Sequence, residues 1–94
     1  MLIGSCRIEL FLPTSHSLKE KRSVIKSIIA RLRNEFNIAI AEVDEHEVWQ
    51  RAVLGVACVS AEASHAQEQL QAVVNWIIDN RPDVQLLTAE SEIL

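Results

Sequence analysis

The chain has 94 residues, of which 49% are hydrophobic and 23% are charged, and it contains only two glycines and two prolines. This composition is ordinary for a globular protein and excludes a chain dominated by disorder or long linkers. A chain of this length predicts a single domain over residues 1–94, with one hydrophobic core and little room for a deep catalytic cavity.

The net charge of −4 is divided unevenly along the chain. Residues 1–36 carry seven Lys and Arg and three Asp and Glu, whereas residues 37–94 carry two and ten. Such a division predicts either a charged partner or two halves of the molecule that complement each other.

Two features bear on the cellular compartment. Cys6 and Cys58 are too few for a disulfide scaffold, and no CxxC or Cys/His spacing accompanies them. We interpret them as buried small hydrophobic residues in a reducing compartment, with a redox or metal pair as the alternative. The apolar N-terminal run is interrupted at Arg7 and is too short for a signal peptide or a membrane span. We therefore expect a cytoplasmic protein with no membrane association.

The first third of the chain predicts a strand followed by a helix. Residues 2–12 alternate between two faces, as in a half-buried strand, and Pro13 ends the alternation. Ser17 to Glu20 has the pattern of a capping box and predicts a helix that ends near Phe36-Asn37, with Asn37 in the left-handed conformation. The apolar stripe of this helix consists of Leu18, Ile25, Ile28, Ile29, Leu32 and Phe36.

The rest of the chain predicts three strands and a second helix. Residues 38–43 form a strand, residues 44–47 turn the chain, and residues 51–60 form a strand that is apolar on both sides and therefore central. Ser60 is predicted to cap a helix that ends at Asn80-Arg81-Pro82. Residues 84–88 form the last strand, which the tail could extend.

The order β-α-β-β-α-β predicts an α+β fold, the ferredoxin-like split βαβ sandwich. Right-handed connections place both helices on one face of an antiparallel sheet. Gly4 and Gly55 lie within the two strands expected to be central. We expect each glycine to permit the close approach of a helix or to mark a bulge.

The sequence contains no convincing catalytic motif. It has no glycine-rich phosphate loop and no nucleophile elbow, and we assign no catalytic residue, no metal ligand and no cofactor. His16, His46 and His65 lie on separate segments and are expected to be exposed to solvent. The acidic run at residues 44–47 could bind a divalent cation, but a solvated hairpin tip is the preferred interpretation.

The first predicted helix concentrates positive charge. It holds six of the nine basic residues, and at 100° per residue four of them fall within an arc of about 60° beside the apolar stripe: Lys19, Arg22, Lys26 and Arg33. Lys19, Lys21 and Arg22 also crowd the first turns, where the helix dipole is unfavourable to cations. One interpretation is a solvated face that the acidic turn partly neutralises. The other is an anion site for phosphate, formed by Lys19, Lys21, Arg22, Lys26 and Arg33.

Three segments resemble the YlxP-like family, a bacterial domain of unknown function. They are the runs SHSLKEKRS at residues 15–23, AEVD at 41–44 and WQRAVLG at 49–55. The resemblance implies a ferredoxin-like fold, no established enzymatic activity, and genes often found among those for translation and ribosome-maturation factors. It therefore leads us to expect a non-enzymatic protein that associates with RNA or the ribosome.

A homodimeric interaction module is the alternative function. The third predicted strand is apolar on both faces, whereas the helices can cover only one. The candidate interface residues are Ile3, Phe11 and Trp49. Trp49 could instead pack over the edge of the sheet, and Trp76 is expected at the boundary of the core. The pI near 5.3 and the absence of tyrosine argue against general nucleic-acid affinity and against an aromatic RNA-binding platform.

Overall fold

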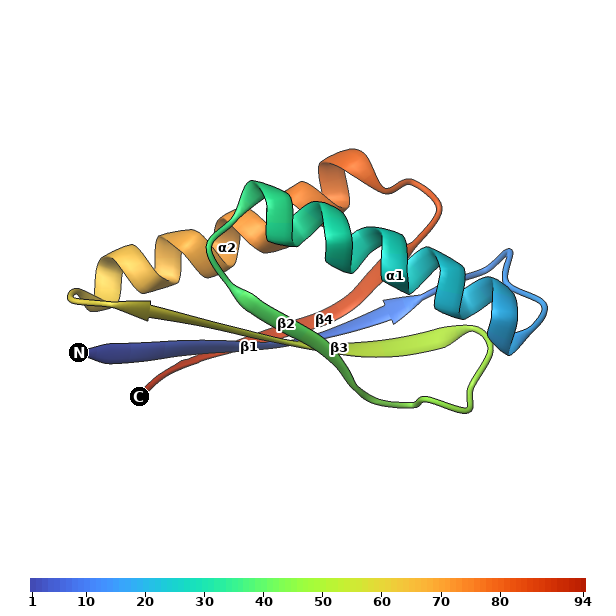
Figure 1. The fold of residues 1–94 in the computed structure, drawn as a ribbon, viewed down its shortest axis with the longest axis horizontal. Coiled ribbons are helices and arrows are strands. Elements are labelled where there is room, and N and C mark those ends of the chain that lie inside the picture. Colours follow the sequence, from blue (N-terminus) through green and yellow to red (C-terminus); the bar gives the residue numbers. More distant parts are fainter.

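The computed structural model describes residues 1–94 and confirms the ferredoxin-like α+β fold (Figure 1). Its elements are β1 (Leu2–Phe11), α1 (Leu18–Glu35), β2 (Ala39–Asp44), β3 (Arg51–Ser60), α2 (Ala63–Asn80) and β4 (Gln85–Ile93). The sheet is antiparallel in the order β2-β3-β1-β4, so β1 and β3 are central and β2 and β4 are the edges. Both helices lie on one face of the sheet (Figure 1). Neither helix is long and apolar enough to cross a membrane.

The start of α1 follows from its capping box. The Ser17 hydroxyl accepts a hydrogen bond from the Glu20 N–H at 3.1 Å, and the Glu20 carboxylate accepts one from the His16 N–H at 2.7 Å. At the other end, Phe36 is extended and stops the helix. The prediction of a left-handed Asn37 was wrong, because Glu45 is the only non-glycine residue with a positive φ, at 59°.

The second half of the chain differs from the predictions at the start of α2. The predicted cap Ser60 lies two residues before the actual N-cap, Glu62, and its hydroxyl accepts a hydrogen bond from the Glu62 N–H at 3.1 Å. Glu62 itself makes no side-chain capping hydrogen bond. The tail does extend the last strand, as the sequence allowed, because β4 pairs with β1 as far as Ile93. Leu94 continues this pairing by exchanging two main-chain hydrogen bonds with Ile3.

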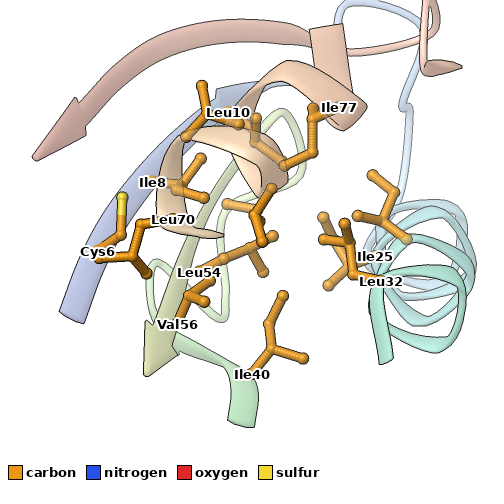
Figure 2. Close-up of a cluster of buried hydrophobic side chains, with 14 of the residues drawn as sticks. Cys6, Ile8, Leu10, Ile25, Leu32, Ile40, Leu54, Val56, Leu70 and Ile77 are labelled. Atoms are coloured by element: carbon orange, nitrogen blue, oxygen red, sulfur yellow. The ribbon is translucent and has the colours of Figure 1, made fainter. Parts of the chain in front are cut away.

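The core lies between the sheet and the two helices (Figure 2). The helix-facing side chains of β1 and β3 are buried there with the stripes of both helices. Leu54 and Val56 of β3 point into this core, so Val53 and Val59 belong to the opposite, open face of the sheet. Both cysteines are free and buried, as their interpretation as small hydrophobic residues requires.

The two glycines of the central strands have different packing reasons. A Cβ at Gly4 would lie 3.1 Å from Leu70 Cδ1 and 3.3 Å from Ala66 Cβ, so Gly4 permits the close approach of α2 as predicted. At Gly55 a Cβ would lie 2.9 Å from Val43 Cγ1. Val43 sits at the register shift of the β2–β3 pairing, so of the two predicted alternatives Gly55 lies beside a bulge and does not serve the approach of a helix.

Candidate functional site

Four of the five predicted cations lie exposed on α1. They are Lys19, Arg22, Lys26 and Arg33. The chain contains five ion pairs, and none of them involves any of these four side chains. Direct pairing with the acidic turn therefore does not neutralise this set, which we call the α1 cations.

The structure corrects the prediction that the fifth cation, Lys21, belongs to an anion site, because its side chain is fully buried. Its ammonium lies 3.0 Å from Glu42 Oε2 and donates to the carbonyl oxygens of Glu45 at 2.7 Å, His46 at 3.2 Å and Arg51 at 3.3 Å. Lys21 therefore holds the β2–β3 loop against the first turn of α1. Its ammonium is not available to a ligand, so Lys21 is no part of an anion site.

The position of Lys21 on the helix explains its burial. At about 100° per residue, Lys21 falls in the middle of the apolar stripe, one turn before Ile25 and two turns before Ile28. A cation at this position must lose its water, and only well-placed oxygen ligands can compensate for that loss. Glu42 of β2, Glu45 and His46 of the β2–β3 loop, and Arg51 at the start of β3 supply these oxygens.

A groove separates α1 from the edge strand β2. It has a volume of about 420 Å³ and is lined by Arg22, Ile25, Lys26, Ile29, Arg33, Ile40, Ala41 and Glu42. Three of the α1 cations therefore border one groove, whereas Lys19 lies outside it at the first turn. Arg33 also donates from Nη2 to the carbonyl oxygen of Ile40 at 3.0 Å, which fixes its guanidinium across the groove. This arrangement can hold a ligand with more than one negative charge and some apolar surface.

The open face of the sheet carries the predicted interface residues only in part. Ile3 and Val59 lie opposite each other in the register of β1 and β3 and are exposed at 39% and 65%, respectively. Phe11 is half-buried at the other end of β1. Ile3 thus lies in an exposed apolar pair, whereas Phe11 is separated from it by the charged centre of the face.

This charged centre is an ion-pair network around Arg7. Arg7 Nη1 lies 3.3 Å from Glu9 Oε1, and Arg7 Nη2 lies 3.3 Å from Asp44 Oδ2. Arg51 Nη2 lies 3.6 Å from Glu9 Oε2. The pKa of Asp44 lies below its usual value, first because the main-chain N–H of Glu45 donates a hydrogen bond to its carboxylate and second because the Arg7 side chain does so too. The network therefore divides the open face and ties β1 to the edge strand β2.

The tryptophans and histidines occupy surface and boundary positions. Trp49 is 55% exposed in the β2–β3 loop, so packing over the sheet covers less than half of it. Trp76 is partly buried against the core, as predicted, with the Arg31 guanidinium 5.8 Å from its ring centroid. His16, His46 and His65 are all exposed, as predicted.

Two sequence comparisons relate this chain to known proteins. Residues 3–91 match the family described as "Protein of unknown function (DUF503)". The chain is also similar to "Uncharacterized protein YlxP" of Bacillus subtilis (strain 168), with 35% identity over 91 residues. That alignment covers 97% of this chain and 98% of the Bacillus protein. Neither description names an activity or a ligand.

Proposed function

The chain belongs to the DUF503 family of YlxP-like proteins of unknown function, and from this premise we propose that it is a non-enzymatic protein that binds RNA, free or within the ribosome. The contact surface in this proposal is the set of α1 cations. The observation that carries it is their exposure without any acidic partner, although the chain as a whole is acidic.

The arrangement of the cations supports a linear polyanion as the ligand. Arg22, Lys26 and Arg33 line the same groove and span about 16 Å along the helix axis. Lys19 adds a fourth charge at the first turn, where main-chain N–H groups and the helix dipole also favour an anion. A row of cations of this length matches several consecutive phosphates better than one small anion.

The location of the acids supports a local contact instead of general affinity for nucleic acid. Asp44 pairs with Arg7 on the open face of the sheet, away from the α1 cations, and Glu42, which lines the groove, is paired with Lys21. The net charge of −4 opposes binding elsewhere on the molecule. Binding through a few phosphate contacts should therefore be weak at high salt and strongly dependent on ionic strength.

A salt titration tests this proposal. The affinity for single-stranded RNA is measured over a range of salt concentrations for the wild type and for the double variant Arg22→Gln/Lys26→Gln. The slope of log K against log salt should decrease by about 0.7 for each lost phosphate contact on a single strand. The matched control is Arg7→Gln/Arg51→Gln, which removes the same charge from the open face of the sheet. An unchanged slope in the α1 variant, or equal decreases in both variants, would reject the α1 cations as the contact surface.

The open sheet face supports homodimerisation as a second candidate function. Beside the exposed pair Ile3 and Val59, a shallow hollow of about 520 Å³ is lined by small residues that include Ala39, Ala41 and Ala57, and also by Arg7 and Arg33. Monomers rarely leave large apolar patches exposed. Light scattering that shows a monomer at high protein concentration would contradict this candidate.

A further inference from the structure

One acid lines the groove that the α1 cations border. Glu42 projects from β2 into the groove wall, and its side chain is 15% exposed. Its Oε2 is buried and lies 3.0 Å from the ammonium of Lys21. The accessible part of the carboxylate, on the side of Oε1, is therefore what a ligand in the groove would meet.

Lys21 fixes the orientation of this carboxylate. The buried ammonium lies 3.0 Å from Glu42 Oε2, and leaving it without a counter-charge would be costly. Glu42 is thus a hydrogen-bond acceptor that cannot rotate away without breaking the pair. Such an acceptor repels a phosphate placed directly on it and attracts a hydroxyl.

A ribose-phosphate chain has this combination of groups. It presents negative phosphates to Arg22, Lys26 and Arg33, and between successive phosphates it carries a 2′-hydroxyl that can donate to a carboxylate. A deoxyribose chain presents the same phosphates without the donor. The mixed lining of the groove therefore distinguishes the two polymers, which a purely cationic groove would not.

An acidic peptide that adds a strand to the free edge of β2 fits the groove less well. Arg33 already occupies the carbonyl oxygen of Ile40, an acceptor in the middle of this edge strand. The register of β2 also shifts between Glu42 and Asp44, which interrupts a regular hydrogen-bonding edge. A row of peptide carboxylates would in addition meet the carboxylate of Glu42.

We propose that Glu42 accepts a hydrogen bond from a ribose 2′-hydroxyl and makes the groove selective for RNA over single-stranded DNA. This inference rests on the proposed function of the α1 cations and adds a sugar specificity to it. In this contact Glu42 Oε1 is the acceptor, and the ion pair with Lys21 holds the carboxylate in position.

The experiment compares three oligonucleotides of one sequence and about ten nucleotides in length. They are oligouridylate, oligodeoxyuridylate and 2′-O-methyl oligouridylate, which carry the same bases and phosphates but differ at the 2′ position. Fluorescence anisotropy at low salt should give about tenfold tighter binding of the RNA than of the other two, the effect of one hydrogen bond to a charged acceptor.

The variant Glu42→Gln tests the assigned residue. Its amide oxygen can still accept from Lys21, which turns the N–H₂ group toward the groove and replaces an acceptor by a donor. The variant should then bind the RNA about as tightly as the other two oligonucleotides. Its affinity for all three should stay the same or rise, because a negative charge has been removed from the groove. The control Glu47→Gln removes the same charge from an exposed residue outside the groove and should keep the preference.

The outcomes separate this inference from the proposed function. Equal binding of all three oligonucleotides, with a salt slope that still depends on Arg22 and Lys26, overturns the role of Glu42 and leaves the α1 surface standing. If none of the three oligonucleotides binds, both the role of Glu42 and the proposed RNA-binding function are wrong. If Glu42→Gln does not fold, as judged by circular dichroism, the comparison of RNA with its 2′-O-methyl form on the wild-type protein decides alone.

Discussion

At the residue scale, Lys21 shows how one side chain can unite two distant segments. Its partners Glu42, Glu45, His46 and Arg51 lie 21 to 30 positions further along the chain, and three of them contribute main-chain oxygens. These oxygens carry no residue-type signature, so the sequence could not indicate them. The available signal is the position of Lys21 in the apolar stripe, whereas the sequence pattern also places Lys21 among the cations of the first turns.

Replacing Lys21 by Met should destabilise the protein strongly. The variant keeps an unbranched apolar side chain, one atom shorter, but leaves the Glu42 carboxylate and three carbonyl oxygens without their cation, which typically costs about 3–5 kcal/mol. For a domain of this size each kcal/mol lowers Tm by roughly 4–8 °C, so thermal unfolding by circular dichroism should show a loss of more than about 10 °C. The control Lys26→Met alters an exposed cation of the same helix and should change stability by less than about 0.5 kcal/mol. Similar Tm changes in both variants would contradict the role of Lys21.

Other single residues were predictable because their signals are local. Ser17 and Glu20 stand three positions apart and bond to main-chain groups of the same turn, so their pattern alone indicates the start of α1. Gly55 gives a weaker signal, since a glycine within a strand indicates a bulge or a close approach without showing which of them occurs. Its crowded neighbour Val43 is brought there by strand pairing and a register shift, neither of which leaves a mark in the local sequence.

At the element scale, α1 has two faces with opposite requirements. Ile25, Ile28 and Leu32 are buried in the core, while the α1 cations remain exposed on the other side. The cations near the N-terminus oppose the helix dipole, which local stability does not explain. We interpret this conflict as the consequence of a binding role for that face.

Substitution of Lys19 tests this interpretation. Lys19 is the second residue of α1 and has no acidic partner, so Lys19→Glu removes an unfavourable interaction with the dipole and adds a favourable one. The free energy of unfolding should rise by roughly 0.5–1.5 kcal/mol at low salt, with about half of that for Lys19→Gln. RNA affinity should fall in the same order. Measuring chemical denaturation and anisotropy on the same samples checks both signs.

Two outcomes of the Lys19 experiment would contradict the account. A gain in stability with unchanged RNA binding would identify the helix face as merely solvated. A loss of stability would mean that Lys19 interacts with an acid in solution, in contrast to its unpaired state in the structure.

Element type was easier to predict than element length. Alternation and the apolar stripes indicate β1, α1, β3 and α2 within a residue or two of their observed bounds. β4 is the exception, since residues 88–92 are polar apart from Ala89 and give little strand signal of their own. Their strand conformation comes from pairing with β1, a tertiary interaction that the local sequence does not encode.

At the scale of the whole molecule, the basic residues of the first third of the chain include some that pair with acids of the remainder and some that stay unpaired. Lys21 with Glu42 and Arg7 with Asp44 join the basic first third to the acidic remainder. The α1 cations are left over from this pairing and gather on one side, beside the edge strand β2. The element order predicted the fold, but which cations would remain unpaired depended on side-chain contacts that only the structure reveals.

The two candidate functions use different surfaces, which meet at Arg33 and the edge strand β2. RNA binding uses the groove between α1 and β2, whereas dimerisation uses the open face of the sheet. Because a 94-residue protein gives a tractable amide spectrum, one nuclear magnetic resonance experiment can report on both surfaces at once.

The most direct test is a ¹H–¹⁵N titration of the protein with single-stranded RNA at low salt. Our account predicts that the largest shifts occur at the amides of α1 and β2 that border the groove, including Arg22, Lys26 and Glu42, and that they reverse when salt is added. Shifts confined to the open-face strand residues around Ile3 and Val59, or no shifts at all, would contradict it.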